Sequence, residues 1–492
     1  MEVLDKIRWG VFFCLIGLLI FFSNFSVLPV DFMDEKRIVE AAFLFVGPAL
    51  SILFYFNYQL GINSKIIFLS GAVFIILLWV SSILAPLPQW AFLQVGWYIL
   101  LALLVLMFAH LYQQHSRRYI KFFIGGLFVL AGLYLGHVLA FTIISYFREN
   151  WPLWPNRARM SVIMNGQQLV PQGFLNFSNE RFFNHIQTWT LPLLVLGTLY
   201  YKRRLIVGIR YVMYAIIAGW WMLVFASDAR GTFIASFASL FFIIFLYRQK
   251  VKEIAKIYIF TALAGLVAYF LLFWLPRLGN GETLIRYSHA GRLRTWKYTL
   301  HQIAAHPYFG VGPMNFSYIK FNPPSSTPHD IILQSAVEWG IPAVVILAGL
   351  VIWAFIAFIH QKNPRPKRKT LIKIMLVASL SAGLIHSMVS GIFNTPFSQL
   401  LFCLILGWAV GYYFNQKNMR LFIKRRRLTA RVWIIGLMLI GNLIFVSQKV
   451  GRDASILNKR KKEYLQTIKN KKLGRRIYYP RFWLQGKIGL EN

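Results

Sequence analysis

Residues 277–340 read RLGNGETLIRYSHAGRLRTWKYTLHQIAAHPYFGVGPMNFSYIKFNPPSSTPHDIILQSAVEWG and interrupt a chain that is apolar on both sides. The flanking runs are long enough to cross a membrane, because a transmembrane helix needs ~20 mostly apolar residues. The segment carries four arginines, among them Arg286, Arg292 and Arg294, and His329 lies near its end. Arginine matches phosphate oxygens, and imidazole titrates near neutrality. The segment therefore predicts a polar site for an anionic ligand on one membrane face.

The composition is that of a membrane protein. The 492 residues are 57% hydrophobic, with a mean hydropathy of +0.55. The net charge of +37 would suggest nucleic acid as a partner in a soluble protein. Here the basic residues cluster between apolar runs, which indicates orientation and contact with anionic membrane lipids, so we expect no nucleic acid. Cys14 and Cys403 lie inside apolar runs and predict packing residues, not a disulfide or metal site.

The apolar runs predict an all-α, polytopic helical bundle with about 12–13 transmembrane helices. Basic clusters between the runs fall on one side if the spans alternate, and this side is then cytoplasmic, together with the N-terminus. Large loops at 148–186 and 277–334 face the periplasm on this count. The spans are expected near 9–30, 38–56, 65–86, 90–112, 121–147, 187–201, 206–226, 231–247, 256–276, 335–360, 371–391, 396–416 and 430–448.

Two domains are expected. Residues 1–448 form one transmembrane domain, and residues 449–492 form a basic C-terminal tail with an aromatic cluster near its end. Thirteen spans would leave the tail outside, whereas one miscounted span would leave it in the cytoplasm. A periplasmic tail is the favoured alternative.

Charged residues near the ends of spans are candidates for the site. A short helix over Gly291–His306 is predicted to carry Arg292 and Arg294. Arg230 follows Asp228 in a short turn between two spans, where a charge is costly unless it is paired or functional. The alternatives are lipid-facing arginines and a structural ion pair between Asp228 and Arg230.

A third cluster begins the span near residue 187. Arg181, Asn184, Gln187 and Trp189 combine charged, amide and aromatic side chains. Amides can bond sugar hydroxyls and aromatic faces can stack on sugar rings, so these residues are candidates for binding a glycan or acceptor. An interfacial aromatic belt explains the aromatics equally well.

Some motifs are missing from the sequence. It has no Asp-x-Asp pair, no Cys/His cluster with metal-ligand spacing and no Walker loop. We therefore expect no metal, no cofactor and no ATP-driven transport, with arginine neutralising any phosphate charge.

The motifs together resemble the bacterial O-antigen ligase and O-antigen polymerase superfamily of inner-membrane proteins, which includes protein O-oligosaccharyltransferases. The resemblance covers about residues 225–345. Asp330 departs from the asparagine or serine that usually follows the family's histidine. The matching pieces are Ala229-Arg230-Gly231, Gly291-Arg292 with Trp296, His306-Pro307-Tyr308-Phe309-Gly310-Val311-Gly312, His329 with Leu333-Gln334, and Glu338-Trp339-Gly340-Ile341.

The resemblance implies a metal-independent glycosyltransferase with a periplasmic site and an undecaprenyl-diphosphate-linked glycan as donor. His329 is implied as the base that deprotonates the acceptor hydroxyl, and Arg230 and Arg292 as ligands of the diphosphate. Charge alone adds Arg294, Arg286 and Arg181 to the diphosphate candidates. Glu338, in the matched pattern, joins the candidates for glycan or acceptor binding.

The acceptor stays open at this point. The favoured acceptor is lipid A-core, as in an O-antigen ligase. The alternatives are a protein hydroxyl, as in a protein O-oligosaccharyltransferase, and a growing glycan, as in a polymerase. Outside this class, a transporter of lipid-linked anions would place its arginines in mid-span, whereas here they lie at span ends.

Overall fold

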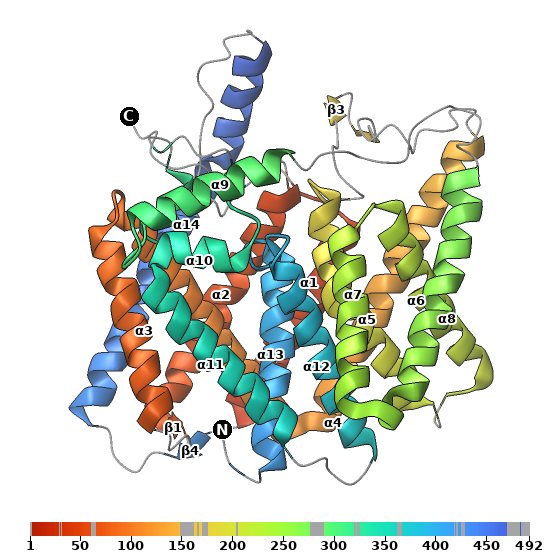
Figure 1. Cartoon of the computed structure of the whole chain (residues 1–492), viewed down its shortest axis with the longest axis horizontal. Helices are drawn as coiled ribbons and strands as arrows, with labels where there is room; N and C mark the ends of the chain where they lie inside the picture. The colour runs from red at the N-terminus through yellow and green to blue at the C-terminus, as the bar shows by residue number, and fades with distance from the viewer. Residues whose placement is uncertain are drawn as a thin grey trace.

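Apolar helices make up most of the chain that the computed structural model describes (Figure 1). It describes all residues except 1, 29, 31, 61–64, 148–161, 165–166, 170–175, 203–204, 276–289, 319–320, 322–324, 362–366, 418, 420–421, 425–428, 470–482 and 484–492. The α-helices of the described residues are α1 (Glu2–Asn24), α2 (Phe32–Asn57), α3 (Lys65–Leu84), α4 (Pro88–Phe147), α5 (Glu180–Tyr201), α6 (Val207–Ala226), α7 (Arg230–Tyr247), α8 (Lys252–Tyr269), α9 (Ala290–Ala305), α10 (Ile331–Trp339), α11 (Ile341–His360), α12 (Lys367–Ser387), α13 (Pro396–Gln416) and α14 (Ala430–Lys469).

Short elements complete the description. A π-helical turn, η2 (Phe270–Trp274), extends α8, and 3-10 turns lie at η1 (Arg248–Val251), η4 (Asn315–Ser317) and η6 (Ile392–Asn394). Two antiparallel strand pairs are present, β1 (Tyr58–Leu60) with β4 (Phe422–Lys424) and β2 (Val162–Met164) with β3 (Gln167–Leu169). Gln59 pairs with Ile423, and Ile163 with Gln168.

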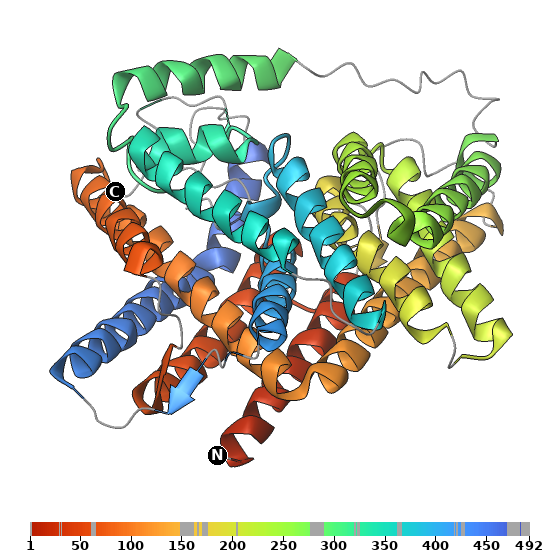
Figure 2. The same ribbon diagram turned by 60° about the horizontal axis from the view of Figure 1, so that its bottom comes forward.

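Most helices run between two opposite faces of the bundle (Figures 1 and 2). Nine helices of the described residues are long and apolar enough to cross a membrane, judged by length and composition. Helix α9 instead lies across one face, which we call the α9 face, and the N-terminus lies at the opposite, N-terminal face (Figure 1). The predicted all-α, multi-pass membrane fold is confirmed.

Helix α4 is two helical segments joined by a kink. The spans expected at 90–112 and 121–147 are its two segments, and the backbone leaves helical geometry between them at His115 (φ −136°, ψ 52°). The residues between the two expected spans contain neither proline nor glycine, so no such residue marks the kink in the sequence. The basic pair Arg117–Arg118 therefore lies on a kinked helix and not in a loop.

Two boundaries differ from those predicted. Helix α5 begins at Glu180, not near 187, because its polar first turns are buried and hydrogen-bonded within the bundle, and Asn179 caps it by accepting from the Arg181 amide at 2.9 Å. The span expected at 335–360 is two helices that meet at Gly340, whose φ of +83° ends α10. The helix predicted over 291–306 is confirmed as α9.

The interior of the bundle lies around α5, α12 and α13. Every residue of α5 from Phe183 to Thr198 is buried, and α12 and α13 are mostly enclosed. Helices α11 and α14 turn most of their apolar side chains outward, as expected for helices that face lipid. The enclosed helices bring the ends of α5, α12 and α13 together beneath the α9 face.

Candidate functional site

His329 lies immediately before α10, on the α9 face. Its backbone is left-handed (φ +59°), a conformation that costs a non-glycine residue about 1–3 kcal/mol. Asp330 then caps α10 by accepting a hydrogen bond from the Leu333 amide at 2.9 Å. The departure from the family pattern at residue 330 thus keeps a side chain that caps the helix. Nδ1 of His329 lies 3.3 Å from Oγ1 of Thr327, which leaves Nε2 as the nitrogen that faces away from this contact.

The turn before His329 is locked to the end of α10. The Val311 amide donates to the Val337 carbonyl at 2.8 Å, and the Gly312 amide donates to the Glu338 carbonyl at 3.0 Å. A Cβ added at Gly340 would lie 2.1 Å from the carbonyl oxygen of Tyr308, so this position cannot hold a larger residue without movement. Two motifs that are separated in the sequence therefore form one structural unit beneath α9.

Helix α9 packs on α10 and carries Arg292 on its inner side. Arg292 is half-buried, Thr295 and Thr299 are buried, and the Trp296 Nε1 donates to the Pro328 carbonyl at 2.9 Å. Arg294 is exposed on the opposite side of the same helix. The two arginines of α9 are thus distinguished by the structure: Arg292 turns toward the histidine loop and Arg294 turns away.

The positive charges of Arg181 on α5, Arg230 on α7 and Arg292 on α9 lie near one another and near His329. Burial, followed by the positive charges of Arg181 and Arg292, lowers the pKa of His329 to about 4. Burial, followed by the charges of Arg181 and Arg230, also lowers the pKa of Arg292. Oδ1 of Asp228 lies 3.3 Å from Nε of Arg230, and both side chains are partly exposed to solvent. The site therefore combines a neutral imidazole with a group of like charges that an anion would stabilise.

A pair of histidines lies next to this site, and sequence reasoning missed it. The rings of His185 on α5 and His386 on α12 are 5.3 Å apart. Nδ1 of His386 lies 2.7 Å from Thr188 Oγ1. A Cβ added at Gly231 would lie 2.6 Å from His386 Nε2. The polar residues of the first turns of α5 were the available signal, but their partners on α12 are distant in sequence.

The remaining candidates of α5 and α10 are enclosed. Asn184 Oδ1 accepts from Ser227 Oγ at 2.9 Å, and Gln187 Nε2 donates to the Trp220 carbonyl at 2.8 Å. Trp189 Nε1 donates to Ser398 Oγ at 2.7 Å, and Glu338 is fully buried. Each of these side chains lies inside the bundle, and direct contact with a glycan or acceptor stays a prediction for them.

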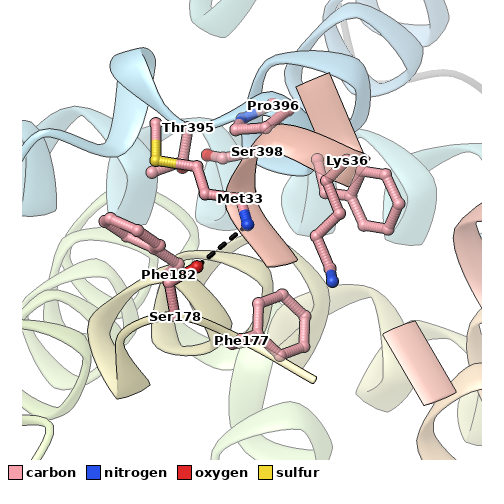
Figure 3. A pocket seen from close by; sticks show the side chains of 9 residues that line it. Met33, Lys36, Phe177, Ser178, Phe182, Thr395, Pro396 and Ser398 are labelled. Carbon is pink, nitrogen blue, oxygen red and sulfur yellow. Dashed lines mark hydrogen bonds between the residues drawn. The ribbon is translucent and has the colours of Figure 1, made fainter. Parts of the chain in front are cut away.

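The pocket in Figure 3 lies where α2, α5 and α13 begin. Ser178 Oγ accepts from the Met33 amide at 2.9 Å. The ammonium of Lys36 donates to the Asn176 carbonyl and lies 4.5 Å from the Phe177 ring centroid. Because its polar groups are already hydrogen-bonded, we interpret this pocket as packing that joins the three helix ends. Its lining residues are Met33, Lys36, Phe177, Ser178, Phe182, Thr395, Pro396, Phe397 and Ser398.

Arg286 lies outside the residues that the structure describes, so its assignment to the diphosphate stays a prediction. In the part of the chain that the structure describes, no group of three or more His, Cys, Asp or Glu side chains is arranged to hold a metal ion.

Residues 213–348 match the family model described as O-antigen ligase. The matched segment includes Arg230, Arg292 and His329, whereas Arg181 lies outside it. No curated protein sequence matches the chain. The match bears out the predicted resemblance to the O-antigen ligase and polymerase superfamily over this segment, and it suggests a glycosyltransferase-like enzyme.

Proposed function

We propose that this protein is a member of the O-antigen ligase superfamily and transfers a glycan from undecaprenyl diphosphate to an acceptor hydroxyl, at a site that faces the periplasm. The observation that carries the proposal is the convergence of a neutral His329 with Arg181, Arg230 and Arg292 on the α9 face. Arginine presents a planar fork that matches diphosphate oxygens, and the charges act at helix ends beside the histidine. The membrane is then the bacterial inner membrane.

In the proposed reaction, Nε2 of His329 takes the proton of the acceptor hydroxyl. The oxygen attacks the anomeric carbon of the glycan, and the bond from that carbon to the diphosphate oxygen breaks. Arg230 and Arg292 stabilise the charge that develops on the departing undecaprenyl diphosphate. The same charge offsets the repulsion between the arginines and the new imidazolium, so proton transfer and departure of the leaving group favour each other.

Orientation supports a periplasmic site. The kink of α4, the end of α5 and the turn after α7 lie at the N-terminal face (Figure 1). They carry basic residues such as Arg117, Lys202 and Lys250, so the positive-inside rule expects the cytoplasm on this side. The α9 face is then periplasmic.

Lipid A-core is the proposed acceptor, and a protein hydroxyl is the second candidate. The specific observation that favours the second is the C-terminal end of α14, which rises on the same face as α9 (Figure 1). A tail on this face would be available to guide a protein acceptor to the site.

A genetic experiment tests the proposal and separates the acceptors. The gene is deleted in its host and complemented with wild type, His329→Ala, or His301→Ala as a control for an exposed histidine of α9. We expect His329→Ala to lose long-chain lipopolysaccharide while His301→Ala restores it. Loss confined to glycoproteins would identify the protein acceptor instead, and normal products of both kinds with His329→Ala would refute the catalytic role.

A further inference from the structure

The segment that joins α12 to α13, Ser390–Thr395, is held from three directions. From α13, Gln399 Nε2 donates to the Phe393 carbonyl at 2.6 Å. From α2, the Arg37 guanidinium donates to the Asn394 carbonyl at 2.5 Å. From α5, the ring nitrogens of His185 lie 2.8 Å from Ser390 Oγ and 2.9 Å from Thr395 Oγ1. A connection with so many long-range hydrogen bonds is a fixed part of the bundle.

This segment lies directly against His329. A Cβ added at Gly391 would lie 3.8 Å from His329 Nδ1 and 3.3 Å from Asn394 Nδ2. The imidazole of His329 therefore lies within van der Waals distance of the position that a Cβ at residue 391 would take. Gly391 has an ordinary φ of −79°, so its backbone does not require glycine; a side chain here would instead crowd the amide of Asn394.

A pair of amides connects the segment to α10. Asn394 Nδ2 donates to Gln334 Oε1 at 2.9 Å, and Gln334 Nε2 donates back to Asn394 Oδ1 at 3.4 Å. The backbone amide of Gln334 donates to the carbonyl of Asp330, the residue after His329, at 2.9 Å. Gln334 is only 4% exposed, so little water competes for these bonds. The amide pair thus fixes the histidine-bearing end of α10 against the segment.

The anchor of the segment is a buried charge. Arg37 pairs with Glu40 in the bundle interior, and the two side chains are 1% and 0% exposed. Arg37 also donates to Gln399 Oε1 at 2.7 Å. A buried ion pair contributes little net stability, but it can specify one arrangement of its surroundings. Here that arrangement is the position of the Asn394 backbone.

We propose that Ser390–Thr395 is a platform that sets the position of His329, and that Gln334 and Asn394 are positioning residues for glycan transfer. The inference rests on the proposed function, because it concerns the geometry of the same base. Neither residue needs to contact donor or acceptor. Their role is to hold the imidazole where it can reach the acceptor hydroxyl, since a misplacement of ~1 Å can cost ~100-fold in rate.

The test compares steady-state transfer by full-length variants reconstituted with a lipid-linked glycan donor. Asn394→Ala and Gln334→Ala each remove the amide pair and should lower kcat by ~10- to 100-fold. The donor KM should stay within about twofold, because the arginines that bind the diphosphate are untouched. The exchange variant Gln334→Asn/Asn394→Gln restores an amide pair and should recover most of kcat.

Two further variants keep the test informative if an alanine variant folds poorly. Gly391→Ala places a methyl group 3.3 Å from Nδ2 of Asn394, so it should disturb the amide pair and lower kcat several-fold at unchanged KM. Asn442→Ala removes a comparable amide, which donates to the Gly96 carbonyl at 3.2 Å far from the site, and should leave both constants unchanged.

An unchanged kcat in Asn394→Ala, an equal loss in Asn442→Ala, or an exchange variant no better than the single ones would overturn the platform. His329→Ala in the same assay reports on the proposed function separately. If it abolishes transfer while the amide variants behave as wild type, only the platform fails. If His329→Ala transfers normally, the assignment of the base itself fails.

Discussion

Replacing Arg181 with glutamine should move the acid limb of the pH–rate profile to higher pH. In the free enzyme, burial and the charges of Arg181 and Arg292 hold the pKa of His329 at about 4. A positive charge disfavours the imidazolium, so removing one raises the pKa, and the base is then lost by protonation at a higher pH. Arg181 is exposed, so glutamine should leave no buried cavity.

The causes of the lowered pKa of His329 limit how far it can rise in Arg181→Gln. Burial is the largest cause and remains in the variant, so the pKa should stay below the ~6.5 of an unperturbed imidazole. A rise of about one unit would lower the neutral fraction of His329 at pH ~5 from about 90% to about 50%. We therefore expect kcat/KM at pH ~5, relative to pH ~7, to fall by about twofold more in Arg181→Gln than in wild type.

The assay is glycan transfer in reconstituted vesicles between pH ~4.5 and 8, with each variant normalised to its own value at pH ~7. This normalisation removes any uniform loss of donor affinity. Arg294→Gln is the control, because Arg294 is exposed on the far side of α9, and its profile should superpose on that of wild type. A profile of Arg181→Gln that superposes on wild type, or shifts to lower pH, would refute the electrostatic reasoning.

Two further predictions concern α9 and the turn beneath it. Arg292→Ala should lower kcat/KM for the donor by ~100-fold while Arg294→Ala changes it little, because only Arg292 turns toward the site; equal effects in a transfer assay would contradict this. Gly340→Ala should destabilise the protein by about 2–5 kcal/mol, from its positive φ and the clash with the Tyr308 carbonyl. Gly349→Ala, which meets open space in α11, should not lower the Tm in thermal unfolding, and an equal Tm loss in both would exclude the clash as the cause.

The fold was largely predictable because membrane spans are long apolar runs with little competing interpretation. The boundaries that failed depend on tertiary contacts. The polar residues in the first turns of α5 are typical of water-facing positions, so the sequence predicted a loop there. In the structure these residues are buried, because they hydrogen-bond to neighbouring helices. The break at Gly340 lies inside the span predicted at 335–360, and its close packing against the Tyr308 backbone is a tertiary contact that the sequence does not show.

The sequence indicated only part of the candidate site. Arg230, Arg292 and His329 stand out because charges beside apolar runs are costly, and these three share the α9 face. Charge alone made Arg181 a candidate, and the fold places its charge near His329 and Arg292 because α5 begins earlier than its hydropathy indicates. The histidine pair His185–His386 depends on contacts between helices that are distant in sequence, so no local pattern could reveal it.

One measurement tests the central claim most directly. The full-length protein is reconstituted in lipid vesicles with an undecaprenyl-diphosphate-linked glycan and a lipid A-core acceptor, and release of undecaprenyl diphosphate is measured together with acceptor glycosylation. We expect the wild type to form both products in equal amounts, and His329→Ala to form neither while it still binds the donor. Glycosylation by His329→Ala at the wild-type rate would contradict the assignment of His329 as the base.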